Sequence, residues 1–315
     1  MPTRRTHPKV GPLPLSPTTF SSLIVFPSRP ETAASVTYFA RLLSQGTAEY
    51  CAERDLRVLD LCTGSGCIPL LFHYEFYSRR SNRDQRLDLV GIDVSPKALQ
   101  LAKENLLSIQ LSAQASEDEK HPSRLQSLTT LRFLHADVLS SQDDAQNTDG
   151  QPRGVIDALR RFHQSESPPT CDILISNPPY ISSKAFRTTT ARSVRHFEPK
   201  LALVPPNRSI SGTSTHNGDV FYPRLLELAE RLQTQVVLFE VADLDQAKRV
   251  ASMGFGQGIW TGVEIWRDEP GAQVARPEEV VIDGKVVKVR GVGNGRSVFA
   301  YRGDGAEWLN RSCSQ

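Results

Sequence analysis

The sequence predicts an α/β fold of the doubly wound type, in which a mostly parallel sheet carries helices on both faces. Three observations support this prediction. Short apolar runs alternate with stretches of helical periodicity along most of the chain. A glycine-containing turn directly follows the first of these runs. Acidic or amide side chains lie at the ends of four runs, where open parallel sheets bind their ligands.

Five apolar runs are expected to form the parallel strands, at residues 57–61, 87–93, 131–137, 172–177 and 235–241. Helices are expected between them, at residues 68–77, from Ser95-Pro96 through "KALQLAKENLL", around 222–232, and along "DLDQAKRVASMGF". Proline suits the first turn of a helix. Two further strands, 258–267 and 297–301, are separated only by a loop and a Val-rich, hairpin-like stretch. This spacing predicts an antiparallel end to the sheet.

Composition excludes several classes of protein. The chain has 315 residues, of which 39% are hydrophobic, so it can bury a sizeable core. A formal net charge of +2 is too mild to indicate a nucleic-acid or membrane partner. No apolar run approaches the ~20 residues that a membrane helix needs. Five cysteines form no CxxC pair and no His-rich cluster, so we expect no metal site, no disulfide framework and a reducing compartment.

The expected organisation is a basic, proline-containing leader or arm at residues 1–25, a domain at 26–305 and a tail at 306–315. Polar stretches near 78–86, 112–127 and 140–170 are expected as surface insertions, the last of them flexible. No acidic residue precedes Glu31, a bias that mitochondrial transit peptides share. Six prolines prevent a continuous helix there, so a disordered basic arm is the alternative.

Side chains at the strand ends predict an adenosine-bearing ligand. Gly64 and Gly66 let the turn after the first strand approach a ligand closely, although a plain tight turn has the same pattern. Asp60 can accept hydrogen bonds, Asp93 can accept both ribose hydroxyls, and Asp137 can meet the exocyclic amine of adenine. The turn lacks the GxGxxG spacing and any basic residue for a pyrophosphate. S-adenosylmethionine therefore fits better than a dinucleotide.

The stretch "SNPPY", residues 176–180, follows the fourth strand and predicts a site for a planar amino group. Asn177 offers a side-chain carbonyl, and the main-chain carbonyl of Pro178 is a second acceptor. Two such acceptors can hold both hydrogens of an NH2 group, and Pro178 and Pro179 fix the backbone without adding a donor. Tyr180 supplies an aromatic face for a flat amide or base. A proline turn that only closes the strand is the alternative.

Several stretches resemble the HemK-type protein N5-glutamine methyltransferases, which methylate the glutamine of the Gly-Gly-Gln motif in peptide chain release factors. They are "FPSRPETA", "VLDLCTGSGCIPL", "GIDVSPKAL", "SNPPYI", "FEPKLAL", "NGDVFYPRLLELA", "FEVADLDQAKRV" and "GNGRSVFAY", in the family's order. Together they cover most of residues 26–301. "NPPY" alone is shared with DNA and RNA amino-methyltransferases, whereas its combination with "FEP" and "NGDVFYPRLL" is more specific.

The resemblance implies a Rossmann-like, seven-stranded class I S-adenosylmethionine-dependent methyltransferase with an antiparallel terminal strand. We expect the cofactor to be bound by Asp60, Cys62, Thr63, Gly64, Ser65, Gly66, Asp93, Asp137, Val138 and Asn177. The expected catalytic residues are Asn177, Pro178, Pro179 and Tyr180. The implied partner is a release factor, with no nucleic acid, no membrane and a monomeric enzyme. A mitochondrial-type eukaryotic member is implied, with a cytoplasmic location as the alternative.

The chain departs from the family pattern in two places. Cys62 stands where the family usually has glycine, and because it is small we expect a modest effect on the turn. Only about 25 residues precede "FPSRPETA", so the family's N-terminal helical domain is expected to be reduced or missing.

Other functions and roles stay open at this point. N6-adenine methylation of DNA or RNA would also present a planar NH2 group, and Arg187, Arg192 and Arg195 keep that alternative open although no recognition domain is evident. A non-catalytic binding protein that has kept the fold is the other alternative, and it would fail to bind S-adenosylmethionine. His196 and Glu198 are expected to orient the substrate or to lie at the surface. Structural roles are expected for His73 and His135.

Overall fold

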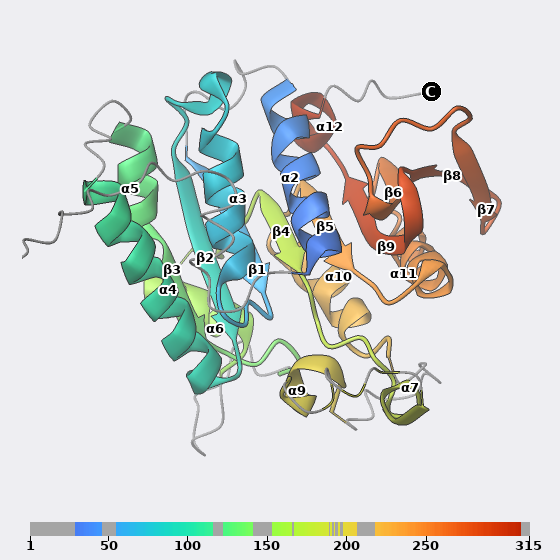
Figure 1. Ribbon diagram of the computed structural model, residues 1–315, viewed down its shortest axis with the longest axis horizontal. Coiled ribbons are helices and arrows are strands. Elements are labelled where there is room, and N and C mark those ends of the chain that lie inside the picture. Colours follow the sequence, from blue (N-terminus) through green and yellow to red (C-terminus); the bar gives the residue numbers. More distant parts are fainter. Residues whose placement is uncertain are drawn as a thin grey trace, which may run out of the picture.

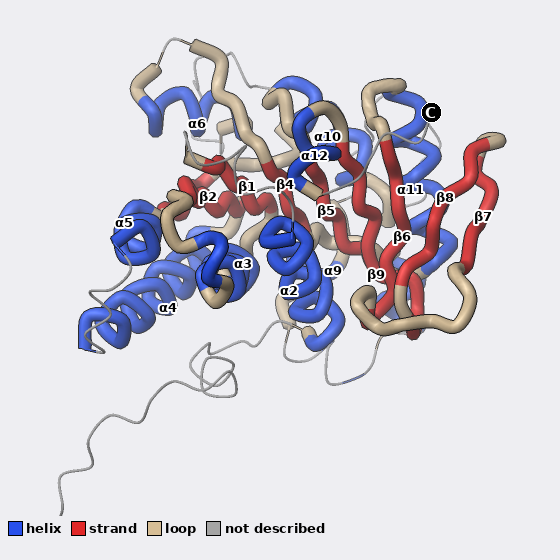
Figure 2. Tube along the Cα trace, turned by 90° about the horizontal axis from the view of Figure 1, so that it is seen from above, coloured by secondary structure: helices blue, strands red, loops and turns tan. Residues whose placement is uncertain are grey.

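The structure is a computed structural model, which describes residues 29–45, 55–115, 122–140, 153–165, 167–188, 190, 192, 195, 198–206 and 218–309. In this part of the chain a nine-stranded sheet forms the centre, in the order β3-β2-β1-β4-β5-β9-β6-β8-β7. Figure 2 shows helices on both sides of it. The predicted doubly wound α/β fold is therefore confirmed.

The five predicted parallel strands are present and pair in parallel: β3 (Arg132–His135), β2 (Leu87–Asp93), β1 (Leu56–Leu61), β4 (Ile173–Ser176) and β5 (Val236–Glu240). β3, β4 and β5 each end one or two residues earlier than expected. β4 ends directly before Asn177, and β3 ends two residues before Asp137. The loops after these strands, and not the strands themselves, therefore carry the two polar side chains.

The antiparallel end of the sheet is confirmed, but the expected number of seven strands is too low. β9 (Val292–Tyr301) runs antiparallel between β5 and β6 (Gly262–Glu269). The Val-rich stretch forms two more strands, β7 (Glu278–Ile282) and β8 (Lys285–Arg290), which extend the sheet beyond β6. Val287 and Val289 are buried whereas Val286 is exposed. Side chains of β8 therefore alternate between the two faces of the sheet, and the buried ones extend the core. β6 begins at Gly262 and not at 258, because helix α11 continues to Gln257 and is ended by a left-handed Gly258.

Each face of the sheet packs against its own set of helices. One hydrophobic cluster contains side chains of α2 (Pro30–Gln45), α3 (Cys67–Tyr77), α4 (Pro96–Ala115), α5 (Pro122–Thr130) and α12 (Asp304–Trp308). The other contains side chains of α6 (Val155–His163), α10 (Phe221–Arg231) and α11 (Leu244–Gln257). The short elements are η1 (Arg80–Asn82), α7 (Ser183–Thr188) and α9 (Lys200–Leu203). Figure 1 shows α7 and α9 outside these two layers, beyond the carboxyl end of β4.

Helix α2 is anchored by aromatic packing. Its Phe39 contacts Phe72 of α3 and Phe299 of β9, with ring centroids 5.8 and 5.4 Å apart, and Phe299 stacks on Trp266 at 4.3 Å. All four side chains are fully buried. The start of this helix is thereby held at the carboxyl edge of the sheet, where Arg29 precedes it.

No helix among the described residues is both long and apolar enough to span a membrane.

Two of the expected polar insertions contain helices that reach the core. Within 140–170, helix α6 buries Val155, Ile156 and Leu159, three side chains on one face of the helix. Within 112–127, α4 continues to Ala115 and α5 begins at Pro122. The expectation of a flexible surface insertion at 140–170 is therefore wrong for residues 155–163, because a few apolar residues at helical spacing suffice to pack a helix within a polar composition.

The expected boundary between domain and tail is also corrected. Ala306, Trp308 and Leu309 are at least 96% buried, and the last two belong to the cluster on the α2 face. The domain therefore extends at least to Leu309. Residues 310–315 and the expected leader at 1–25 lie outside the described residues.

Candidate active site

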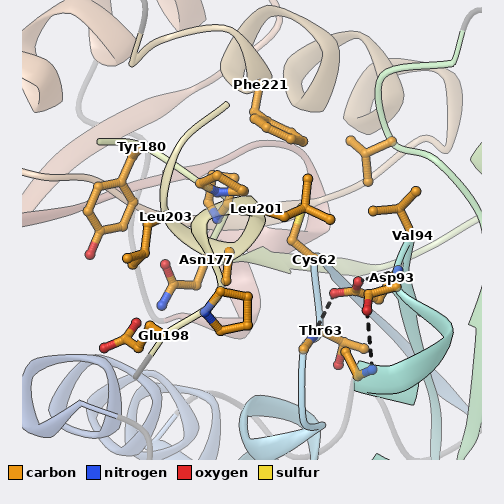
Figure 3. Close-up of a pocket in the computed structure, with 18 of the residues that line it drawn as sticks. Cys62, Thr63, Asp93, Val94, Asn177, Tyr180, Glu198, Leu201, Leu203 and Phe221 are labelled. Atoms are coloured by element: carbon orange, nitrogen blue, oxygen red, sulfur yellow. Dashed lines mark hydrogen bonds between the residues drawn. The ribbon is translucent and has the colours of Figure 1, made fainter. Parts of the chain in front are cut away.

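A cavity of about 390 Å³ lies at the carboxyl ends of β1, β2 and β4 (Figure 3). Its wall is formed by the turn after β1, the end of β2, the loop after β3, the "NPPY" segment, residues 198–206 and the start of α10. It brings together most of the predicted site residues: Cys62, Thr63, Gly64, Ser65, Asp93, Asp137, Val138, Asn177, Pro178, Pro179 and Tyr180. Asp60 and Gly66 are the two predicted residues that do not line it.

Asp60 lies beneath the glycine turn and is 1% exposed. Neither of its carboxylate oxygens has a hydrogen-bond partner, and the hydroxyl of the neighbouring Thr63 is also buried without one. Burial raises the pKa of Asp60 to about 8, and the charge of Asp93 adds to the rise. The Thr63 hydroxyl opposes the rise in this pKa only in part, since the two groups do not meet hydrogen-bond geometry. Asp60 is thus a buried acidic group without a hydrogen-bond partner, directly before the turn that lines the cavity.

The turn itself is shaped by main-chain hydrogen bonds to Asp93. One carboxylate oxygen accepts from the N–H of Gly64 and the other from the N–H of Ser95, both at 2.8 Å, and Figure 3 draws these two bonds. Burial nevertheless raises the pKa of Asp93. Gly66 has φ +75°, and a Cβ there would lie 2.6 Å from the ring of Phe133. Gly66 therefore acts on the ligand site through the shape of the turn.

Cys62 adopts a left-handed backbone conformation, with φ 62°, at the start of this turn. That conformation favours glycine, the residue that the family usually has here. Burial raises the pKa of the Cys62 thiol well above its ordinary value, and the carboxylates of Asp93 and Asp60 add to the rise. Burial likewise raises the pKa of Cys67 to about 11. Neither thiol in the cavity wall is thus suited to act as a thiolate nucleophile.

The loop after β3 is held by a side chain that the sequence reasoning missed. Arg224 of α10 is buried and donates to the main-chain carbonyls of Val138, at 3.2 Å, and Ser140, at 2.8 Å. Asp137 accepts from the N–H of Leu139 at 2.9 Å. An arginine within the apolar face of "YPRLLELA" is the signal that could have found it, since a buried guanidinium needs acceptors.

The acceptor end of the cavity begins where β4 ends. Ser176 donates to the carbonyl of Leu61 at 2.7 Å and joins the ends of β4 and β1. Tyr180 is 8% exposed, donates to Glu240 at 3.0 Å and accepts from Arg29 at 3.2 Å. In Figure 3 the side chain of Asn177 lies between Tyr180 and Glu198. The predicted cradle, Asn177 to Tyr180, therefore lines the cavity, and ionisable side chains from distant segments lie beside it.

These ionisable side chains were predicted only in part. Glu198, one of the two candidates for orientation, lines the cavity and forms an ion pair with Arg29 at 3.2 Å. The other candidate, His196, lies outside the described residues. Arg29 and Glu240 were missed, although Glu240 ends the fifth strand as Asp93 ends the second. Applying the same strand-end argument to β5 could have found Glu240.

The arginines that kept the nucleic-acid alternative open lie outside the cavity. Arg187 is at the end of α7, and Arg187, Arg192 and Arg195 are all exposed. Arg195 donates to the main-chain carbonyl of Arg187 at 3.1 Å. None of the three lines the cavity wall.

The two histidines with expected structural roles contact main-chain carbonyls. His73 is 3% exposed and contacts the carbonyl of Arg124 at 3.0 Å, and burial lowers its pKa to about 4. His135 contacts the carbonyl of Val94 at 3.0 Å. Neither of them lines the cavity.

Comparison with known proteins gives sequence relatives that are named glutamine methyltransferases, most of them of release factors and one of ribosomal protein uL3. The chain is 28% identical over 209 residues to the probable MRF1 mitochondrial N(5)-glutamine methyltransferase mtq1 of Schizosaccharomyces pombe, which covers 64% of this chain and 52% of the relative. It is 29% identical over 149 residues to the mitochondrial MRF1 N(5)-glutamine methyltransferase MTQ1 of Saccharomyces cerevisiae, covering 47% and 33%. The chain thus spans about half the length of the first relative and a third of the second. No protein-family model matches.

Among solved structures, the hMettl16 catalytic domain in complex with the MAT2A 3'UTR hairpin 1 matches 89% of this chain and 72% of that one, with 13% identity and a TM-score of 0.44. The order β3-β2-β1-β4-β5, followed by an antiparallel strand before β6, is a Rossmann-like arrangement with ligand residues at the carboxyl edge. The similarity to HemK-type protein N5-glutamine methyltransferases that the motifs indicated is confirmed by the sequence relatives.

Proposed function

We propose that the protein transfers a methyl group from S-adenosylmethionine to the side-chain amide nitrogen, N5, of the glutamine in the Gly-Gly-Gln motif of a peptide chain release factor. The observation that carries the proposal is the shared cavity. The turn organised by Asp93 and the cradle of Asn177, Pro178 and Tyr180 line one space of about 390 Å³. The names of the two MRF1 methyltransferases support the choice of acceptor.

The residues present fit S-adenosylmethionine. A Cβ at Gly66 or Gly91 would clash with the ring of Phe133, so these glycines let the turn after β1 and strand β2 pack closely on β3, while Gly64 leaves open space at the cavity wall. Asp93, Asp137 and Val138 would hold the adenosine part. The unpartnered Asp60 favours a cationic ligand above it, because a nearby positive charge stabilises the ionised carboxylate. When bound, the cofactor supplies an electrophilic methyl group.

The acceptor residues would activate and orient an amide. An amide nitrogen is a poor nucleophile because its lone pair is delocalised into the carbonyl group. If the Asn177 side chain and the Pro178 carbonyl accept its two hydrogens, negative character on nitrogen increases and the nitrogen is aimed at the methyl donor. Tyr180 supplies the aromatic face against which the planar group lies.

No strong base is required by this proposal, because the amide proton becomes acidic only once the methyl group has been transferred and is then lost to solvent. The side chains at the cradle agree with such a mechanism. Burial raises the pKa of Tyr180, and its contact with Glu240 adds to the rise. Tyr180 therefore acts as a neutral hydroxyl that positions neighbouring groups.

The location and assembly are also proposed. Both relatives are named mitochondrial, which supports a mitochondrial location for this protein. A reporter fused to residues 1–30 should then enter mitochondria, and a diffuse cytoplasmic reporter would contradict the proposal.

We further propose that the protein acts as a monomer without direct contact to nucleic acid. Sedimentation of the protein alone and gel-shift experiments with RNA and DNA would check these two points.

The decisive experiment incubates the protein with S-adenosylmethionine and a full-length mitochondrial or bacterial-type release factor, beside the variant Asn177→Ala. Peptide mass spectrometry should find one added methyl group on the Gly-Gly-Gln glutamine with the wild-type protein. The variant should lose at least ~100-fold in rate, as expected when a group that acts on the transition state is removed. Calorimetry reports cofactor binding separately. If the cofactor binds and no release factor is methylated, the acceptor assignment is wrong.

A further inference from the structure

Glu240 is a buried carboxylate at the end of β5, adjacent to the acceptor end of the cavity. It is 4% exposed and accepts two hydroxyl hydrogen bonds. Thr32 of α2 donates to one carboxylate oxygen at 2.5 Å, and Tyr180 donates to the other at 3.0 Å. A buried carboxylate carries a large desolvation penalty. If this position contributed only to stability, an apolar side chain of similar size would stabilise the fold more.

The hydroxyl of Tyr180 is bonded in both directions. It donates to Glu240 and accepts from a guanidinium nitrogen of Arg29 at 3.2 Å. A phenol held by one acceptor and one donor has its ring fixed in position and in rotation, whereas packing alone restrains it less. The face of this ring is the one proposed to support the acceptor amide.

Arg29 extends the network from Tyr180 to Glu198, another residue of the cavity wall. Its second guanidinium nitrogen contacts both oxygens of Glu198, at 3.2 and 3.4 Å. Glu198 begins the segment 198–206, which includes α9 and contributes Pro199, Leu201 and Leu203 to the wall. Figure 3 shows Glu198, Leu201 and Leu203 around the cradle. The position of this wall is thereby coupled to the position of Tyr180.

We propose that Glu240, Thr32 and Arg29 are positioning residues for methyl transfer, which act through Tyr180 and Glu198 to hold the acceptor amide in line with the methyl donor. The inference rests on the proposed function and deepens it. It assigns to Thr32 of α2, Arg29 directly before that helix and Glu240 of β5, all far from "NPPY" in sequence, a role in orientation rather than in cofactor binding.

The first test measures transfer and cofactor binding with the variants Glu240→Gln and Tyr180→Phe. Each should reduce kcat by roughly 10-fold to 100-fold, the range for a misplaced reacting group, and should leave cofactor affinity within ~2-fold of wild type. Because both variants break the same hydrogen bond, the double variant should be little slower than either single one. Additive losses, or equal losses in kcat and in cofactor affinity, would overturn the inference.

Glu264→Gln provides a matched control. Glu264 is 3% exposed and is paired with Arg290 on β8, and it lies outside the cavity wall. This variant should lower the melting temperature while the folded protein keeps its kcat. If Glu264→Gln lowers kcat as much as Glu240→Gln does, the effect is general destabilisation and the positioning role is wrong.

Hydrogen exchange tests the network without any acceptor. In Glu240→Gln and in Arg29→Met, amides of residues 180–188 and 198–206 should exchange faster than in wild type, while those of 62–66 and 93–95 keep their rates. Unchanged exchange in both acceptor segments would overturn the inference. Hydrogen exchange does not depend on turnover, so the two proposals can fail separately. A wild-type protein that does not methylate release factors would contradict the proposed function. The exchange rates would still show whether Glu240 and Arg29 hold the two acceptor segments in place.

Discussion

The two ends of the cavity are built in different ways. At the cofactor end, Asp93 binds the main-chain N–H groups of Gly64 and Ser95, which lie 29 and 2 residues away in sequence. At the acceptor end, side chains bind side chains across 60 residues for Tyr180 and Glu240, 151 for Arg29 and Tyr180, and 208 for Thr32 and Glu240. The turn at the cofactor end is therefore held through main-chain groups of neighbouring elements, whereas the acceptor end is held by a side-chain network across the fold.

This difference predicts how each end responds to change. A turn shaped by the backbone tolerates a different side chain, as Cys62 in place of the family's glycine illustrates. A side-chain network depends on the identity of every member, because each hydrogen bond needs a specific donor and acceptor. Substitutions should consequently separate the two ends in their effects on cofactor affinity and on transfer rate.

The largest expected effect concerns the acidic group beneath the cofactor end. A rise in the pKa of Asp60 from 3.8 to about 8 corresponds to about 6 kcal/mol against the ionised folded state. Because the folded protein binds this proton more tightly than the unfolded chain, the free energy of unfolding should fall as the pH rises from about 4 to about 8. Asp60→Asn should remove this dependence and be the more stable protein at pH 8.

Chemical denaturation of the ligand-free protein at several pH values checks the prediction for Asp60. His73 serves as an internal reference of opposite sign. Its pKa is lowered to about 4, so its contribution to stability is lost as the pH falls from about 6.5 to about 4. If the free energy of unfolding depends on pH in the same way in the wild-type protein and in Asp60→Asn, the pKa of Asp60 is not raised by folding.

The next effect separates the ends by removing the carboxylate that shapes the turn. Asp93→Ala deletes the acceptor of two main-chain N–H groups and should weaken cofactor binding by about 3 kcal/mol, or roughly 100-fold. The acceptor end should be little affected, with KM for the release factor within ~3-fold of wild type when the cofactor is saturating. Calorimetry and steady-state kinetics measure the two quantities. Faster hydrogen exchange throughout residues 198–206 in this variant would contradict the independence of the two ends.

A smaller effect is expected from crowding the acceptor end. A Cβ at Gly218 would lie 2.5 Å from the main-chain oxygen of Tyr180, so Gly218→Ala should displace the cradle and lower kcat by roughly 10-fold. Gly256→Ala is the matched control, because a Cβ there meets nothing within 4 Å. Cofactor affinity should be unchanged in both variants. A fall in cofactor affinity with Gly218→Ala, at constant kcat, would reverse the assignment of the two ends.

The smallest effect tests the tolerance of the turn. Cys62→Gly relieves a left-handed conformation that costs about 1–2 kcal/mol for other residues. Glycine also loses about 0.5–1 kcal/mol through its greater freedom in the unfolded chain. The net result should be a stabilisation of no more than about 1.5 kcal/mol with an unchanged cofactor affinity, measured by denaturant titration and calorimetry. A destabilised variant would mean that the packing of the Cys62 side chain outweighs the strain.

Much of the cofactor end could be predicted from the sequence because its signals are local. The apolar run that forms β1, the glycines after it and the acid at the end of β2 lie within about forty residues, and strand periodicity places them at one edge. The same holds for "SNPPY", whose position follows from the end of β4. The Arg29–Tyr180–Glu240 network could not be predicted in this way, since no local pattern specifies which distant side chains meet.

The sequence by itself determined the five parallel strands, the antiparallel end of the sheet and the residues presented at the strand ends, because each depends on short-range periodicity and on turn chemistry. Only the tertiary structure decided that Asp60 lies beneath the turn, that α6 and residues 306–309 belong to the core, and that Glu240 joins Thr32 to Tyr180. These features depend on which buried faces pack together. That choice is made by the complementarity of the whole core, to which residues from all parts of the chain contribute.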